Sequence, residues 1–157
     1  MNIIQNVQIP PDDAHPDIKN FYEHWRSIFS GDRLPGRQHF DPLDVAKLLP
    51  RIMLIAIDRD PLSFQVRLAG SKIEEFAGES LKGKPFAHRL TGPDRQRAER
   101  GLRAVIEEKQ PNWRRGKPLI QWEKNFMMLE RIFLPLAENG EMVDMILTLT
   151  IHTEPTA

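Results

Sequence analysis

The 157-residue chain carries 22 Lys and Arg residues against 22 Asp and Glu residues, and it contains no cysteine. Its length favours one domain, and 40% hydrophobic with 28% charged residues argues against wholesale disorder. The missing cysteines exclude disulfides, thiolate metal sites, iron–sulfur clusters and cysteine nucleophiles, and they fit a cytoplasmic location. No membrane segment is predicted, because the longest apolar run, residues 52–57, is too short.

The zero net charge conceals an uneven distribution along the chain. The net charge is −3 over residues 1–81, +7 over residues 82–124 and −4 over residues 125–157. A general nucleic-acid binder is not expected from a neutral chain. The basic middle segment suits an acidic partner or an anionic ligand instead.

Residues 1–15 are polar and contain prolines, which predicts a flexible N-terminal lead-in. Pro16 suits the first turn of a helix, and Gly31 suits its end. Between them, apolar residues recur at helical spacing: Ile18, Phe21, Tyr22, Trp25, Ile28 and Phe29. This pattern predicts an amphipathic helix over residues 16–30. Its apolar stripe either packs into the core or docks a second copy or a partner protein.

Two further helix starts and two strands follow. Asp41 and Pro42 predict the capped start of a short helix that ends at Pro50. The apolar run over residues 51–57 predicts a buried strand, and alternation over 64–68 predicts a strand with one exposed face. Ser71 and Glu74 form a capping-box pattern before a short helix. The sequence from Thr91 to Asp94 is a similar start for a longer helix, which Pro111 ends.

Three strands complete the prediction, over residues 113–120, 126–136 and 142–151. Asn139-Gly140 predicts a tight type I′ hairpin turn between the last two, because both central residues of that turn need positive φ. The element order predicts an α+β domain over residues 16–152, with an antiparallel sheet, helices on one face, and a C-terminal tail over 153–157.

One segment and the element order together resemble the PAS (Per-Arnt-Sim) sensor domain. Residues 68–84, LAGSKIEEFAGESLKGK, leave a strand into a short helix, pass a glycine and reach a Leu-x-Gly-Lys turn. Ser71 stands where many relatives have Asn. Several other features are similar to a bacterial subgroup of short stand-alone PAS proteins: Trp25, Leu34-Pro35, Asp41-Pro42, Leu48-Leu49-Pro50, Leu134-Pro135-Leu136 and Asn139-Gly140.

The resemblance implies a five-stranded antiparallel sheet with short helices wrapped over one face and a pocket between them. It also implies dimerisation through the N-terminal helix, here residues 16–30. We expect no attached output domain, and therefore a sensory or regulatory module that acts in trans on a signalling partner protein. A pure protein-interaction domain with a filled core and a small α+β enzyme or carrier are the alternatives.

The predicted pocket would hold a small apolar ligand without a covalent bond. Its candidate walls are Ile73, Phe76, Phe86, Met127, Met128, Leu129, Met145 and Leu147, which could equally fill the core. His88 is the candidate haem ligand, although a lone histidine more often only forms a hydrogen bond or faces solvent. We expect neither haem nor, without cysteine, a cysteine-linked flavin or chromophore.

The basic residues of the middle segment predict a surface that clamps an anionic ligand or binds an acidic partner. Its members are Arg97, Arg100, Arg103, Arg114, Arg115 and Lys117. The alternative is a solvated helix face with Arg103 paired to Glu107. No nucleic-acid reading motif accompanies these charges. Catalysis is not expected, because Glu74 and Glu75 are adjacent on a helix and no nucleophile or phosphate-loop motif occurs.

Overall fold

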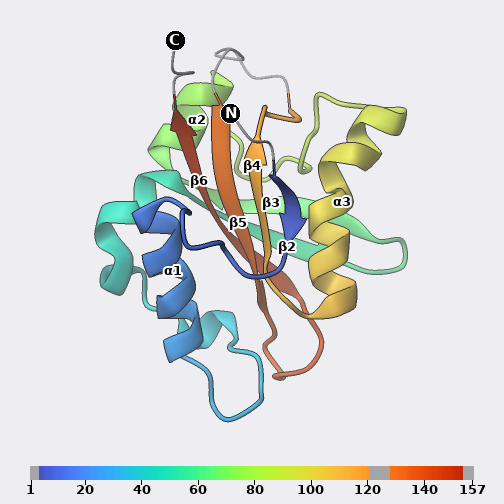
Figure 1. The fold of residues 1–157 in the computed structure, drawn as a ribbon. Helices are drawn as coiled ribbons and strands as arrows, with labels where there is room; N and C mark the ends of the chain where they lie inside the picture. Colours follow the sequence, from blue (N-terminus) through green and yellow to red (C-terminus); the bar gives the residue numbers. More distant parts are fainter. Residues whose placement is uncertain (1–3, 121–127, 154–157) are drawn as a thin grey trace.

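Six antiparallel strands form one sheet in the order β1-β4-β5-β6-β2-β3 (Figure 1). The computed structural model describes residues 4–120 and 128–153. The strands are β1 (Ile4–Val7), β2 (Ile52–Asp58), β3 (Ser63–Ala69), β4 (Asn112–Gly116), β5 (Met128–Leu136) and β6 (Met145–Thr153). Strands β2 to β6 make up the predicted five-stranded sheet, so the α+β fold class is confirmed.

Strand β1 is the addition that the sequence does not predict. Residues 1–15 are predicted as a flexible lead-in, but Ile4 pairs with Arg115 and Val7 pairs with Trp113. Without β1, β4 would be an edge strand with unpaired backbone N–H and C=O groups, and an extended segment that reaches these groups gains hydrogen bonds. Pairing partners about a hundred residues away therefore order a segment that has no strong local pattern.

The two helices that follow β3 cover one face of the sheet, as predicted for the short helices, whereas the N-terminal helix lies on the other face. The α-helices are α1 (Pro16–Ser27), α2 (Ser71–Ala77) and α3 (Gly92–Glu108), and two 3₁₀ helices, η1 (Arg37–His39) and η2 (Pro42–Arg51), join α1 to β2. Side chains alternate between the faces of a strand. The face of β5 that carries Arg131 and Phe133 meets α3, whereas α1 covers the face that carries Glu130 and Leu134.

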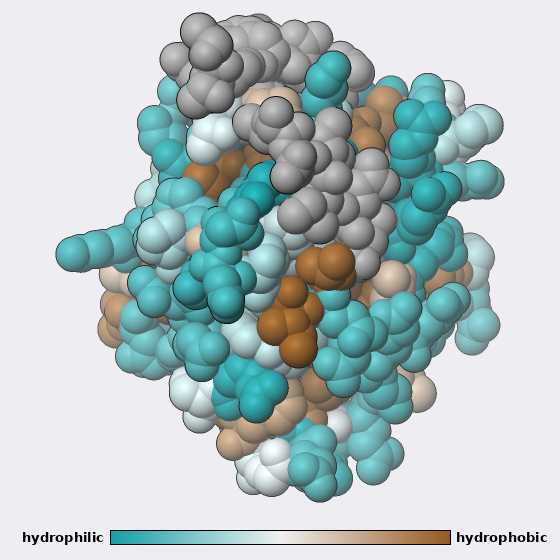
Figure 2. Space-filling view, viewed as in Figure 1, coloured by the Kyte–Doolittle hydropathy of each residue, from teal (hydrophilic) through white to brown (hydrophobic). Residues whose placement is uncertain are grey.

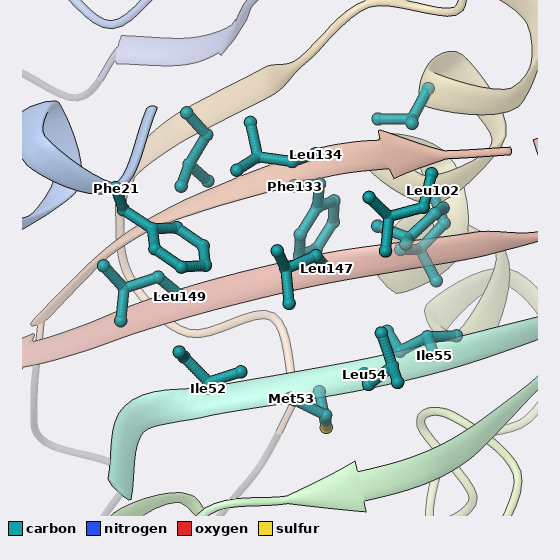
Figure 3. Close-up of a cluster of buried hydrophobic side chains, with 14 of the residues drawn as sticks. Phe21, Ile52, Met53, Leu54, Ile55, Leu102, Phe133, Leu134, Leu147 and Leu149 are labelled. Atoms are coloured by element: carbon teal, nitrogen blue, oxygen red, sulfur yellow. The ribbon is translucent and has the colours of Figure 1, made fainter. Parts of the chain in front are cut away.

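The apolar stripe of α1 packs into the core of its own chain. Ile18, Phe21, Tyr22 and Trp25 are buried, and Trp25 Nε1 donates a 2.9 Å hydrogen bond to the carbonyl oxygen of Pro135 on β5. Figure 3 shows Phe21 beside Leu149 of β6. Core packing therefore accounts for these four stripe residues.

Ile28 and Phe29, the other two stripe residues, are partly buried and lie after α1, which ends at Ser27 rather than at residue 30. The face of the molecule drawn in Figure 2 is mostly hydrophilic, with small separate hydrophobic areas. The stripe thus offers no free apolar face in this arrangement, and dimerisation stays a prediction.

Two of the predicted helix caps differ in the structure. Asp41 does cap η2, since its Oδ1 accepts a 2.9 Å hydrogen bond from Leu43 N. The capping boxes at Ser71 and Thr91 are wrong, because neither α2 nor α3 has a side-chain cap hydrogen bond. Gly70 precedes α2 instead.

Gly70 occupies that position because the chain passes very close to η2. A Cβ atom there would lie 2.2 Å from the carbonyl oxygen of Leu49. Glu74, the other half of the predicted box, accepts a 2.8 Å hydrogen bond from Leu81 N and so fixes the chain after α2.

The strands after α3 have shorter bounds than predicted, and their hairpin uses a longer loop. β4 ends at Gly116, and residues 121–127 lie outside the described part. Strands β5 and β6 are joined by residues 137–144, in which Gly140 has φ +84°. Asn139 is not in the left-handed region, and its Oδ1 accepts hydrogen bonds from the backbone N–H groups of residues 141 and 142. The prediction of a type I′ turn is therefore wrong, although β5 and β6 do form the predicted hairpin.

Candidate functional site

A cavity of about 70 Å³ lies between the sheet and its covering helices. Seven side chains line it from four strands of the sheet: Met53, Arg114, Leu129, Arg131, Phe133, Thr150 and His152. Five residues line it from α2, α3 and the loops: Ile73, Phe86, Ala98, Leu119 and Ile120. A water molecule needs roughly 10–15 Å³ of such space, so this volume holds a group of a few heavy atoms.

Backbone pairing places the loop wall of this cavity. The segment after α2 runs along the outer edge of β3, where Val66 N donates to Lys84 O and Phe86 N donates to Phe64 O, both at 2.9 Å. These bonds direct Phe86 inward. On the other side, Gly101 of α3 approaches Arg131 so closely that a Cβ atom would lie 2.6 Å from Arg131 Nη2.

The structure brings together three of the predicted pocket residues and separates the others. Ile73, Phe86 and Leu129 line the cavity. Phe76 lies next to it, with its ring on that of His152.

Three other predicted pocket residues, all within the described part of the chain, do not line this cavity. Leu147 is buried in the core, Met145 is packed against that core, and Met128 lines a separate surface hollow with Asp13 and Arg115. Met127 lies outside the described residues.

Two buried arginines form the polar side of the cavity. Arg114 on β4 and Arg131 on β5 are directly opposite each other in the sheet register, and their exposed fractions are 5% and 7%. Arg131 Nη1 donates to the carbonyl oxygen and to Oδ1 of Asn112, both at 2.6 Å, and its guanidinium carbon lies 3.8 Å from the centre of the Phe133 ring. Arg114 Nη2 donates to the carbonyl oxygen of Lys117 at 2.6 Å.

Burial disfavours the charge on both of these groups. Loss of hydration lowers the pKa of the Arg114 guanidinium. It lowers the pKa of Arg131 much further, and the positive charge of Arg114 adds to that effect. Burying two like charges next to each other is costly unless an anion or hydrogen-bond acceptors compensate them.

His152 adds a third basic side chain to the sheet wall. Its ring packs on the Phe76 ring with centroids 4.0 Å apart. Burial first, and then the charge of Arg51, lower the pKa of His152 from 6.5 to about 4, so the ring is neutral at pH 7. Among the described residues, neither Nδ1 of His152 nor Nη1 of Arg51 has a hydrogen-bond partner, although both atoms are buried.

His88 is held outside this cavity by a carboxylate. Its Nε2 lies 2.9 Å from Oε1 of Glu79, which also binds Lys84, while Oε2 of Glu79 binds Arg89. The hydrogen bond from Lys84 is the main cause that lowers the pKa of Glu79 to about 2. This arrangement matches the hydrogen-bonded alternative for His88. A haem or flavin ring system does not fit the cavity of about 70 Å³ between sheet and helices, since sites for such molecules have roughly 300 Å³ or more.

The six basic residues of the middle segment do not form one surface. Arg97 and Arg103 on α3 are exposed and pair with Asp94 and Glu99, so the predicted partner Glu107 is replaced by Glu99. Arg100 and Lys117 are exposed. Arg114 and Arg115, which are adjacent on β4, point to opposite faces of the sheet.

Arg115 forms ion pairs with Asp13 and Glu130 beneath the N-terminal segment. The presence of both carboxylates raises its pKa, although burial acts in the opposite direction. Arg115 therefore ties the lead-in to the sheet, and of the six basic residues only Arg114 reaches the cavity.

Sequence reasoning misses the most informative wall residues. Arg131 and His152 are not predicted as site residues, and neither are Met53, Phe133 and Thr150. One signal was present: Glu130 and Arg131 interrupt an otherwise apolar strand, and charged residues are rarely buried without a reason.

No other arrangement in the described part of the chain suggests chemistry. Glu74 bonds to a backbone N–H, and Glu75 pairs with Lys72 at 3.2 Å, so the two adjacent carboxylates have separate structural contacts. Among the residues that the structure describes, no group of three His, Asp or Glu side chains could hold a metal ion. In the same residues, no helix has the length and apolar character that a membrane span requires.

Comparison with known proteins finds one matching family and two solved structures of low sequence identity. A family model described as PAS domain matches residues 13–151. An RNA-binding light-oxygen-voltage receptor is 12% identical with a TM-score of 0.49, and the match covers 96% of this chain and 37% of the receptor. A fungal LOV domain photoreceptor is 14% identical with a TM-score of 0.45, covering 74% of this chain and 94% of that one. No curated protein matches the chain.

Proposed function

Because this chain belongs to the PAS domain family, as its sequence predicts, we propose that it is a sensory module that binds a small molecule non-covalently in the cavity between sheet and helices. The cavity wall carries the proposal. It combines apolar side chains from α2, α3 and the loops with a few polar groups from the sheet, which is the usual composition of a small-molecule site.

A ligand in this position is able to change the outer surface of the domain. Ile73 of α2 and Ala98 of α3 both line the cavity, so a bound molecule contacts both helices and the sheet at once. A ligand that binds one packing of these helices better than another shifts the population toward it. The surfaces of α2 and α3 would then present the signal to a partner protein in trans.

The test fills the cavity and asks whether binding is lost. We would titrate propionate, propionamide and propylamine into the ¹⁵N-labelled protein and follow the backbone amides of Ile73, Phe86 and Leu129 by NMR. Ala98→Leu adds three carbon atoms to the cavity wall, whereas Ala104→Leu makes the same change elsewhere on α3 and is the matched control.

We expect at least one probe to shift the cavity amides in the wild type and in Ala104→Leu, and not in Ala98→Leu. If no probe shifts them in the wild type, or if Ala98→Leu binds like the wild type, the cavity is not a ligand site. The domain would then be better explained as a protein-interaction module with a filled core. A melting curve of each variant shows whether it is folded.

A further inference from the structure

The cavity has two chemically different sides. The helix and loop side is apolar, with Ile73, Phe86 and Ile120, whereas the sheet side carries Arg114, Arg131 and His152. None of the lining residues that the structure describes is acidic. A molecule that matches both sides has a negative charge at one end and a short apolar body at the other.

Arg114 and Arg131 present their guanidinium groups from neighbouring strands. Their Cα atoms are register partners, and both side chains lie on the face of the sheet that α3 covers. Arg131 is held in place by Asn112 and by the Phe133 ring. Such fixed donors lose little freedom when they bind a carboxylate, which an arginine recognises with two parallel hydrogen bonds.

Arg114 has donors to spare. A guanidinium carries five N–H donors, and the hydrogen bond found for Arg114 is the one to the carbonyl oxygen of Lys117. Within the described residues, no Asp or Glu forms an ion pair with Arg114, although its exposed fraction is 5%. Nδ1 of His152 is a further buried nitrogen without a described partner, and it lies on β6, which β5 separates from β4.

We infer that the ligand of this cavity is a small organic carboxylate, whose charged end binds Arg114 and Arg131 and whose apolar part lies against Ile73 and Phe86. This inference rests on the function proposed above and narrows it to one chemical class. Inorganic oxyanions are disfavoured because they leave the apolar side unmatched. The volume of about 70 Å³ limits the carboxylate to a few heavy atoms.

The test compares molecules of nearly equal shape and different charge. Propionate and propionamide differ in the negative charge, propylamine is a cation of similar length, and inorganic phosphate has the charge without the apolar body. Hydrogen bonds between charged groups are worth roughly 1.5–3 kcal/mol, so we expect propionate to bind at least about tenfold more tightly than propionamide. Dissociation constants come from the same NMR titration.

Variants then assign this preference to the arginine. Arg114→Gln should reduce the ratio of propionate to propionamide affinity to about twofold or less, while the affinity for propionamide stays nearly unchanged. Arg114→Lys keeps the charge but not the planar fork, and it should give an intermediate ratio. Arg97→Gln, an exposed change on α3, is the control and should preserve the wild-type ratio.

The outcomes separate the two proposals. If propionamide or propylamine binds as tightly as propionate, or phosphate binds more tightly, the carboxylate inference is overturned while the ligand site stands. If no probe binds the folded wild type, both are overturned. If propionate is preferred but Arg114→Gln and Arg114→Lys, shown by melting to be folded, both keep the full preference, the charged end does not lie at Arg114 and the inference fails.

Discussion

Replacing His152 with glutamine removes a titrating ring from the wall of the cavity. In the folded protein this ring packs on Phe76, and burial together with the charge of Arg51 lowers its pKa from 6.5 to about 4. In the unfolded chain the same ring has its ordinary pKa near 6.5. Between these two values, therefore, the unfolded state binds a proton on this ring that the folded state does not bind.

The size of the effect follows from the two pKa values. The free energy of unfolding changes by about 1.4 kcal/mol for each unit by which the pKa differs between the states. The pKa difference of His152 therefore leaves the free energy of unfolding unaffected above about pH 6.5 and lowers it progressively as the pH falls toward 4. The total loss is about 3 kcal/mol, and no further change arises from this group below pH 4.

Urea unfolding of the wild type and of His152→Gln at intervals from pH 7.5 to 4 measures this directly. The difference between the two proteins is the informative quantity, because the carboxyl groups that also titrate in this range are the same in both. We expect the wild type to lose about 3 kcal/mol relative to the variant between pH 6.5 and 4. The loss of the contact with Phe76 adds an offset that does not depend on pH. A difference that stays constant within about 0.5 kcal/mol over this range would refute the reasoning.

Three other substitutions test how the site is supported. Trp25→Phe keeps an aromatic ring but loses the 2.9 Å hydrogen bond to Pro135 O. It should lower the free energy of unfolding, measured by urea unfolding, by about 1–2 kcal/mol. An unchanged value contradicts the docking of α1 on β5. Gly70→Ala places a Cβ atom 2.2 Å from Leu49 O and should lower the free energy of unfolding, measured in the same way, by about 2 kcal/mol or more. Wild-type stability of this variant would mean that the backbone at residue 70 does not approach Leu49 this closely. Glu79→Gln should be less stable than the wild type above pH 4.5. The gap should shrink as the pH falls toward 2, because the carboxylate, whose pKa is lowered to about 2, is progressively protonated over this range. A gap that stays undiminished down to pH 2 argues against the contacts of Glu79 with its basic neighbours.

The local elements were largely predictable because their causes are local. Pro16 and the helical spacing of Phe21 and Trp25 predict α1 within a few residues of its observed bounds. The alternation around Val66 predicts β3, and Asp41 predicts the start of η2. Failures occurred where a long-range contact competes with a local pattern. Ser71 fits a capping box in sequence, but the close approach of η2 leaves room only for the glycine before it.

The same distinction holds for the candidate site. The sequence predicts Ile73, Phe86 and Leu129 as pocket walls because apolar residues near a sheet and short helices have few other places to go. It cannot predict which apolar residues leave a gap, since that depends on how the side chains of four strands and two helices fit together. Leu147, for example, has the same character as Leu129 but points to the opposite face of the sheet.

The amino-acid sequence by itself determined the family, the α+β class and the absence of any cysteine-based chemistry, because these depend on composition, spacing and order along the chain. Tertiary structure alone decided the polar side of the cavity. Arg114 and Arg131 are 17 positions apart in sequence, and only the antiparallel register of β4 and β5 makes them neighbours. Burial then removes both guanidinium groups from water, so the hydration that each loses has to be replaced by hydrogen-bond acceptors or an anion, as the two acceptors on Asn112 do in part for Arg131.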